Sequence, residues 1–316
     1  MTATSHDSLT FARQPEISHD YPNVLFQELG IFRPSPALQA MNVLLSAVPV
    51  DLGKLGKAVQ AGSELAEEAV RLCNSSLFAL SRPVSSLEQA VVATDADLVR
   101  TLLLTCWLTK LTGSKVAARE IQMFWSHSLL VAQISRRIGD WAGLAQTEQV
   151  FLAGLLHDAG ALPIIALLSK NKNAESRNNF EDLGESIESQ RLRFGTDHCE
   201  LGQKLNAILD FPLPVAEVIA RHHQRETTLP ASPALSIVGC AEVISQVRNH
   251  WAKHELCAEE VEPFIKDALR AWLAGLNLSA SLPLVAALRS DLMGSIRMHN
   301  AQIFQRDPAA EAGARI

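Results

Sequence analysis

The stretch Gly154-Leu155-Leu156-His157-Asp158-Ala159-Gly160 places an adjacent histidine and aspartate at the end of an apolar run. Successive residues of an α-helix point about 100° apart, so these two side chains could hardly reach one ion from the middle of a helix. At a helix end the chain turns, and Gly160 and Pro163 predict such an end here. We therefore expect His157 and Asp158 to project together from a helix terminus.

Further histidines and one acid lie on either side of this pair. Histidine nitrogens and carboxylate oxygens are ligands that divalent metals take in proteins. The candidate metal ligands are His127, His157, Asp158, His198, His222, His223 and Glu242. A metal held there could turn water into a nucleophile at neutral pH, which makes His157 and Asp158 the candidate catalytic residues. Alternatively, the chain keeps only the shell of such a site.

Each candidate also has a purely structural interpretation. His127 alone could be a hydrogen-bonded core histidine, and His157-Asp158 could form a helix-end cap with a buried ion pair. His222-His223 could lie at a solvated helix end, where positive charge suits the helix dipole. Glu242 lies among apolar residues and would need a partner if buried, which either a metal or a histidine could provide.

Composition limits the class of protein. The chain has 316 residues, of which 47% are hydrophobic, so it can bury one large core or two modest ones. The formal net charge is −6 and the isoelectric point is about 5.9. An acidic chain without a Lys/Arg run lacks the positive surface of a general nucleic-acid binder, so that class is excluded.

Cysteine usage and hydropathy predict a soluble protein of the cytoplasm. The five cysteines form no CxxC pair and are odd in number, which favours reduced thiols. The polar residues 1–20 contain no apolar core of a signal peptide, and we expect them to form a mobile tail. The apolar stretch 151–168 is broken by His157, Asp158, Gly160 and Pro163, so no membrane span is expected.

Helical periodicity dominates the chain, and period-2 alternation is scarce, so the sequence predicts an all-α fold. Thr147 and either Ser85 or Ser86 are predicted N-caps. Two or more helices are expected within 261–304. The other main helices are expected over residues 37–47, 98–111, 120–138, 147–157, 163–168, 184–194, 200–209, 215–221 and 236–247.

The candidate residues, in this order, resemble the HD superfamily of metal-dependent phosphohydrolases, and more closely its HDOD branch. The resemblance covers residues 25–250. It is carried by Asn74-Ser75-Ser76, Arg82-Pro83-Val84-Ser85-Ser86-Leu87, Phe124-Trp125-Ser126-His127-Ser128, Ala153–Gly160, Phe194-Gly195-Thr196-Asp197-His198, and Leu213-Pro214 leading to His222-His223. Each piece alone is weak, and their joint order and spacing are specific.

The resemblance implies an HD-like helical bundle. It divides the chain into a tail (1–20), an N-terminal helical part (21–118), an HD-like core (119–255) and a C-terminal helical extension (256–316). It also implies that His127, His157, Asp158 and Glu242 converge on a metal. The remaining candidates, His198, His222 and His223, would line the same cleft and could hold a second ion. The implied cofactor is one or two divalent ions of Fe, Mn, Zn or Mg, or none.

Three departures from the superfamily pattern bear on function. The final acid, usually Asp, is Glu242, whose extra methylene moves the carboxylate. Ala161 stands where active members often carry a Lys, so one cation that could stabilise phosphate charge is missing. The tripeptide that marks the branch that cleaves cyclic dinucleotides is also absent.

The resemblance therefore implies a bacterial signal-transduction module that binds a protein partner or a small nucleotide. The alternative is an active metal-dependent phosphohydrolase that acts on a nucleotide or phosphodiester. A third possibility is a sensor whose cleft only binds a ligand. Metal content and turnover discriminate among them. The sequence leaves the oligomeric state open.

Overall fold

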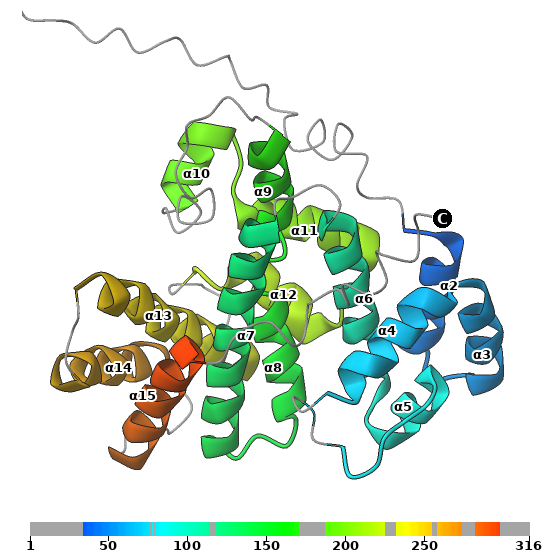
Figure 1. Ribbon diagram of the computed structural model, residues 1–316, viewed down its shortest axis with the longest axis horizontal. Helices are drawn as coiled ribbons and strands as arrows, with labels where there is room; N and C mark the ends of the chain where they lie inside the picture. The colour runs from blue at the N-terminus through cyan, green and yellow to red at the C-terminus, as the bar shows by residue number, and fades with distance from the viewer. Residues whose placement is uncertain are drawn as a thin grey trace, which may run out of the picture.

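All regular elements in the described part of the chain are α-helices, which confirms the predicted all-α class (Figure 1). The computed structural model describes residues 34–75, 78, 80–113, 118–170, 187–224, 232–254, 258–273 and 282–297. The expected tail, residues 1–20, lies outside these residues, as do the first residues of the helix expected over 184–194 and the end of the segment 261–304. The division at residues 118 and 255 stays a prediction.

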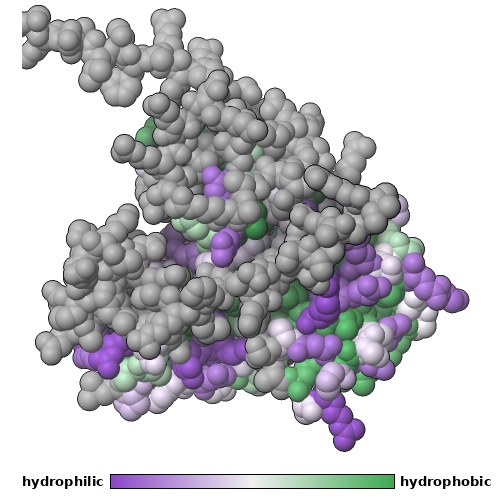
Figure 2. All heavy atoms as spheres, viewed as in Figure 1, coloured by the Kyte–Doolittle hydropathy of each residue, from purple (hydrophilic) through white to green (hydrophobic). Residues whose placement is uncertain are grey.

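Within the described residues, the N-terminal part contains five helices: α2 (Pro36–Ser46), α3 (Leu52–Ala61), α4 (Ser63–Cys73), α5 (Leu87–Ala93) and α6 (Ala96–Gly113). Polar side chains start several of them. Ser35 accepts a hydrogen bond from the third amide of α2, and Pro36 presets its first turn. Ser86, one of the two predicted caps, accepts from Gln89 N at the start of α5. Figure 2 shows hydrophobic and hydrophilic side chains interspersed over α3–α5, as on an ordinary solvated surface.

Among the remaining described helices, α8 is the central one. These helices are α7 (Ala118–Trp141), α8 (Thr147–Leu156), α9 (Ala161–Lys170), α10 (Ile187–Phe194), α11 (His198–Leu209), α12 (Leu213–Arg221), α13 (Pro233–His254), α14 (Ala258–Leu273) and α15 (Leu282–Arg297). Helices α6, α7, α12 and α13 all pack against α8 (Figure 1). All residues from Val150 to Leu156 are buried. A helix that is apolar on every side belongs in a core.

The stretch Thr147–Ala166 is long and apolar enough to cross a membrane by composition, and 89% of it is buried inside the protein. It comprises α8, a turn and the first residues of α9 rather than one straight helix. The burial agrees with the expectation that this stretch is a core segment.

Two glycines allow α8 and the turn after it to pack closely against their neighbours. A Cβ on Gly154 would lie 2.9 Å from Ala132 Cα of α7. A Cβ on Gly160 would lie 1.9 Å from the carbonyl oxygen of His198 and 2.4 Å from Gly202 N. No side chain fits at either position. The absence of a side chain at Gly160 therefore brings the turn that carries Asp158 directly against the first turn of α11.

A buried polar cluster joins the N-terminal helices to α11. Arg100 of α6 donates to Asn42 Oδ1 (2.7 Å) and to the backbone carbonyl and carboxylate of Asp210 (2.7 Å to Oδ2). Asn42 Nδ2 donates to the carbonyl of Leu209 at 2.6 Å. The left-handed φ of Asp210, 50°, ends α11 and turns its last carbonyls toward these donors. We call these residues the Arg100 cluster.

Several predicted boundaries differ from the structure. Thr147 is the first residue of α8, and the residue before it, Gln146, makes no side-chain cap bond, so the predicted cap is wrong. Helix α9 begins at Ala161 rather than Pro163, because proline fits the first turn of a helix as well as its first residue. Helix α11 begins two residues before the predicted Glu200, because Asp197 caps it through Glu200 N (2.9 Å).

Candidate metal centre

The structure brings the seven predicted site residues into one connected cluster contributed by five helices. The ends of α8 and α12 supply His157-Asp158 and His222-His223, as predicted for helix termini. The other three come from the middle of α7 (His127), the first residue of α11 (His198) and α13 (Glu242). Asp158 belongs to two groups of potential ligands, and its two carboxylate oxygens divide the cluster into two halves.

The first half-site consists of His127, His157, Glu242 and the Oδ2 atom of Asp158. The two histidine Nε2 atoms lie 3.3 Å apart. Glu242 Oε2 is 3.1 Å from the Nε2 of His127 and 3.2 Å from that of His157. Asp158 Oδ2 is 3.5 Å and 3.3 Å from the same two atoms. The longer glutamate side chain at position 242 therefore reaches both rings.

The second half-site consists of His198, His222, His223 and the Oδ1 atom of Asp158. Asp158 Oδ1 is 3.3 Å from the Nε2 atoms of both His198 and His222. Those two nitrogens are also 3.3 Å from each other. The ring of His223 lies 4.3 Å from that of His222 between centroids, and this residue is exposed at the rim.

Backbone carbonyls fix the orientation of two of the rings. His157 Nδ1 lies 2.8 Å from the carbonyl oxygen of Gly154, and His222 Nδ1 lies 2.9 Å from that of Val218. A carbonyl only accepts, so each Nδ1 carries a proton and donates it. In the neutral form of each ring, the lone pair is therefore on Nε2, which points into the cluster. Metal-binding histidines are oriented by the same kind of contact.

In the first half-site, the carboxylates and burial have opposite effects on the pKa values of the histidines. Burial by itself would lower the pKa of His127, but Glu242 and Asp158 outweigh it and raise that pKa to about 9. The same competition raises the pKa of His157 to about 10, with Asp158 as the largest favourable influence. Burial would raise the pKa of both carboxyl groups, and the adjacent histidines instead hold both well below their usual range. Without a cation, protons on the histidines balance this half-site.

In the second half-site, burial has the largest effect on the pKa values of His198 and His223. It lowers the pKa of His198 to about 4 and that of His223 to about 3, with neighbouring histidines acting in the same direction. Both rings are therefore neutral at pH 7. Nearby Asp158 opposes this effect without overcoming it. A cation could bind these nitrogens without displacing protons from them.

The donor set fits a divalent ion. Asp158 Oδ1 is buried and makes no hydrogen bond, although two Nε2 atoms lie 3.3 Å away. In the neutral form, His222 and His198 both direct lone pairs toward that oxygen, so three acceptors face one another. A shared cation resolves this arrangement. The separations match the roughly 3.0–3.5 Å expected between neighbouring ligands around an ion with bonds of about 2.1 Å.

Two buried polar residues near the cluster are not among the site residues predicted from the sequence. Gln190 of α10 is fully buried, and its Oε1 lies 2.9 Å from His198 Nδ1. No motif or spacing signals this contact. Asp197 caps α11 and accepts from Arg191 Nε at 2.7 Å. Its spacing to Glu200, three residues on, is a capping pattern that could have identified it.

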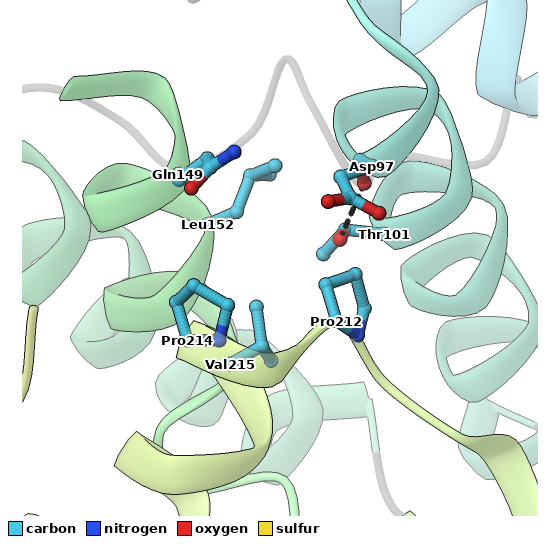
Figure 3. A pocket seen from close by; sticks show the side chains of 7 residues that line it. All are labelled: Asp97, Thr101, Gln149, Leu152, Pro212, Pro214 and Val215. Carbon is cyan, nitrogen blue, oxygen red and sulfur yellow. Dashed lines mark hydrogen bonds between the residues drawn. The ribbon is translucent and has the colours of Figure 1, made fainter. Parts of the chain in front are cut away.

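A separate pocket lies between α6, α8 and α12, and none of the predicted site residues lines it (Figure 3). The Thr101 hydroxyl already donates to the Asp97 carbonyl at 2.7 Å. The lining is otherwise largely apolar. Its residues are Asp97, Thr101, Gln149, Leu152, Pro212, Pro214 and Val215.

Solved structures with the same fold match nearly the whole chain. An HDOD domain protein of unknown function from Geobacter sulfurreducens has a TM-score of 0.61 at 21% identity, covering 90% of this chain and 99% of that one. A protein from Shewanella amazonensis, provisionally named a phosphohydrolase, has a TM-score of 0.54 at 20% identity, covering 89% and 96%. A second protein from that organism, provisionally named a metal-dependent phosphohydrolase, has a TM-score of 0.52 at 15% identity, covering 87% and 98%.

These identities establish a shared fold and nothing further. No curated protein matches the chain. The family model for the HDOD domain matches residues 33–225, which is more than half of the sequence and includes His127, Asp158 and His222. The chain therefore belongs to the HDOD domain family.

Proposed function

We propose that this chain is a regulatory module of the HDOD type whose buried cluster binds two divalent metal ions bridged by Asp158. One observation carries the proposal: the two oxygens of this carboxylate face two separate sets of histidine Nε2 atoms, and one of those oxygens is buried without a hydrogen bond. Buried acceptors that face one another need a proton or a metal ion between them, and the lowered pKa of His198 disfavours the proton.

The first ion would be held by His127, His157, Asp158 Oδ2 and Glu242. The second would be held by Asp158 Oδ1, His198 and His222, with His223 at the rim. Together, the proposed ligands of the two ions are His127, His157, Asp158, His198, His222, His223 and Glu242. Imidazole ligands suit Fe and Zn, and the two carboxylates of the cluster would also suit Mn. When bound, a divalent ion supplies Lewis acidity to the site.

The closed geometry favours regulation over catalysis. The side chains of His127 and Asp158 are each 17% exposed, and that of Glu242 is 10% exposed. Structural metal sites are closed, whereas catalytic ones keep an open position for substrate. Ala161 is buried, so its position supplies no cation for a phosphate. Bound ions would hold five helices together and thus control the shape of the module.

An active metal-dependent phosphohydrolase is the second candidate, with His157 and Asp158 at its catalytic centre. The complete ligand set favours it, as does the exposed imidazole of His223 at the rim of the cluster. Two proteins of the same fold carry phosphohydrolase names. The substrate would be a nucleotide or phosphodiester that reaches the site past His223.

The module is proposed to act in the cytoplasm through a signalling protein or a small nucleotide. The cysteines among the described residues, Cys73, Cys106, Cys199 and Cys240, are free and buried. Burial raises the pKa of each thiol, so none is a reactive thiolate. Free thiols suit a reducing compartment.

The first experiment measures metal content by elemental mass spectrometry in protein purified without chelator or nickel affinity. We expect two Fe, Mn or Zn ions per chain and the loss of the first in His157→Ala. Asn42→Ala is the control, because it disturbs a buried polar residue in the Arg100 cluster without touching the ligands. Protein that stays metal-free after soaking in millimolar divalent ions would rule out the metal centre.

Turnover separates the two candidates. If the chain is a regulatory module, a metal-loaded sample should show no activity against a panel of nucleotides and cyclic dinucleotides. Hydrolysis that disappears in His157→Ala would favour the phosphohydrolase.

A further inference from the structure

One metal-facing histidine is oriented by a side chain from another helix. His157 Nδ1 donates to a carbonyl three residues earlier in the chain, and His222 Nδ1 donates to one four residues earlier. Each carbonyl belongs to the helix that ends at the histidine. His198 Nδ1 instead lies 2.9 Å from Gln190 Oε1, which belongs to α10. Its orientation therefore depends on the position of a second element.

The amide of Gln190 has only one orientation that satisfies its contacts. Its Oε1 lies 3.0 Å from the backbone nitrogen of His198 and 2.9 Å from Nδ1 of the same residue. A backbone N–H only donates, so the atom facing it must be the amide oxygen rather than the amide nitrogen. That oxygen can then only accept from Nδ1. The neutral ring of His198 is thus the Nδ1–H tautomer, with its lone pair on Nε2.

This tautomer leaves Asp158 Oδ1 without a hydrogen bond that the other tautomer of His198 could supply. If the proton were on Nε2, it could be donated to Asp158 Oδ1, which is 3.3 Å away and otherwise has no hydrogen bond. Gln190 prevents that pairing, because it accepts the proton at the opposite nitrogen. The contact keeps a buried acceptor unpaired and leaves a lone pair available for a cation.

Helix α10 is tied to the first turn of α11 by a second side chain. Arg191 Nε donates to Asp197 Oδ2 at 2.7 Å, and Asp197 is the residue that caps α11. The opposite side of α10 is open to solvent, since Leu192 is 78% exposed. Two adjacent residues of one short helix therefore position the cap and the first residue of α11, and that first residue is His198.

We propose that Gln190 is the positioning residue that fixes His198 as the Nδ1–H tautomer, so that α10 controls metal binding in the second half-site and leaves the first unaffected. The inference rests on the proposed metal function. The selectivity follows because His157 is held by the backbone rather than by α10. A displacement of α10 would release His198 to pair with Asp158 Oδ1 and would weaken the second ion.

The test compares the wild type with Gln190→Met and Gln190→Glu. Methionine has a similar length and cannot accept strongly, whereas glutamate keeps an oxygen acceptor for both contacts. The tautomer of His198 is read from ¹⁵N chemical shifts in metal-free protein, with the signal assigned by its loss in His198→Gln. We expect Nδ1–H in the wild type and in Gln190→Glu, and Nε2–H in Gln190→Met.

Metal affinity is then measured by competing each protein against a chromophoric chelator with Mn²⁺ and with Zn²⁺. Gln190→Met should weaken the second ion by roughly 10–100-fold, as removal of contacts behind a metal ligand commonly does, and should leave the first unchanged. Circular dichroism confirms that the variant folds. Gln190→Glu should bind both ions.

The tautomer and affinity measurements fail separately. An Nε2–H signal in the wild type, or an unchanged tautomer in Gln190→Met, would overturn the role of Gln190. Equal weakening of both ions would overturn the selectivity. A tautomer that switches as expected in a protein that binds no metal would refute the metal function and leave the orientation by Gln190 intact.

Discussion

The Arg100 cluster and the metal-centre cluster are both buried and polar, and they differ in whether their donors and acceptors balance. In the Arg100 cluster, the Arg100 guanidinium and the Asn42 amide nitrogen are the donors. They donate to oxygens of Asn42, Asp210 and Leu209. In the second half-site, around Asp158 Oδ1, the Nδ1 donors of His198 and His222 are used on outside acceptors, and the atoms that converge inside are lone pairs or a carboxylate oxygen.

The difference separates a structural polar cluster from a binding site. A matched set of buried groups satisfies itself and needs nothing further. An unmatched set costs free energy until something of opposite character enters. The balance of donors and acceptors is therefore a better guide to function here than burial, because both clusters contain buried polar side chains. Three substitutions or conditions, together with the tests above, challenge this distinction.

The largest expected change in stability comes from Arg100→Met. The substitution leaves Asn42 Oδ1 and the carbonyl of Asp210 without their donor, and it should lower the free energy of unfolding by about 3 kcal/mol. The figure is below that for a fully buried ion pair because the Asp210 side chain is 81% exposed. Urea denaturation measures the loss, and metal affinity should not change.

Asp210→Asn is the matched control for Arg100→Met. Asparagine tolerates the left-handed backbone at this position and keeps the carbonyl that accepts from Arg100. Its cost should be under about 1 kcal/mol. If Arg100→Met instead removed metal without a loss of stability, the two clusters could not be divided into structure and site.

A second effect is expected from pH in metal-free protein. The pKa values of His127 and His157 are raised to about 9 and about 10, above their unfolded values near 6.5. Groups with a raised pKa stabilise the fold fully below pH 6.5, and that contribution is lost as pH rises through the folded values. The free energy of unfolding should therefore fall as pH rises from 7 to 10.5, the window set by the two raised pKa values.

The metal-saturated protein is the comparison for this pH series. A bound ion takes the place of the histidine protons, so the decline attributable to His127 and His157 should disappear. Other groups that titrate in this range affect both samples alike. Denaturation curves are measured with and without metal at each pH. If the free energy of unfolding fell with pH to the same extent in both samples, these histidines would not carry the effect.

The smallest effect is expected from Glu242→Asp, which restores the acid more usual in the superfamily. Removal of one methylene withdraws the carboxylate by about 1.5 Å from two Nε2 atoms that now lie 3.1 and 3.2 Å away. We expect the affinity of the first ion to fall about 10-fold, or about 1.4 kcal/mol, with the second unchanged. Chelator competition measures both ions.

Gln246→Ala is the control for Glu242→Asp, because it removes a contact to Oε1 (3.1 Å) and leaves Oε2 in place. It should change metal affinity little. If Glu242→Asp bound the first ion more tightly than the wild type, then α13 would already be placed for the shorter acid, and Glu242 would be a departure that weakens the site.

The sequence by itself determined the class of fold and the residues of the candidate site. Helical periodicity is a local property, so α7, α8 and α12 could be placed within a few residues of their observed bounds. The seven candidate residues were named from residue type and order, and all seven lie in one cluster. Boundaries were less reliable, as at Thr147, because capping depends on the conformation of one residue.

Only the tertiary structure decided how the polar groups pair. The contact between Gln190 and His198, the two-sided use of Asp158 and the bonds of Arg100 to Asp210 join residues on different helices. Residue type states what a side chain can donate or accept, but its partner depends on how helices distant in sequence pack. Asn42 and Leu209, which are 167 residues apart, could not have been paired from local pattern. Balance between donors and acceptors, which separates the site from the structural cluster, is therefore a property of packing.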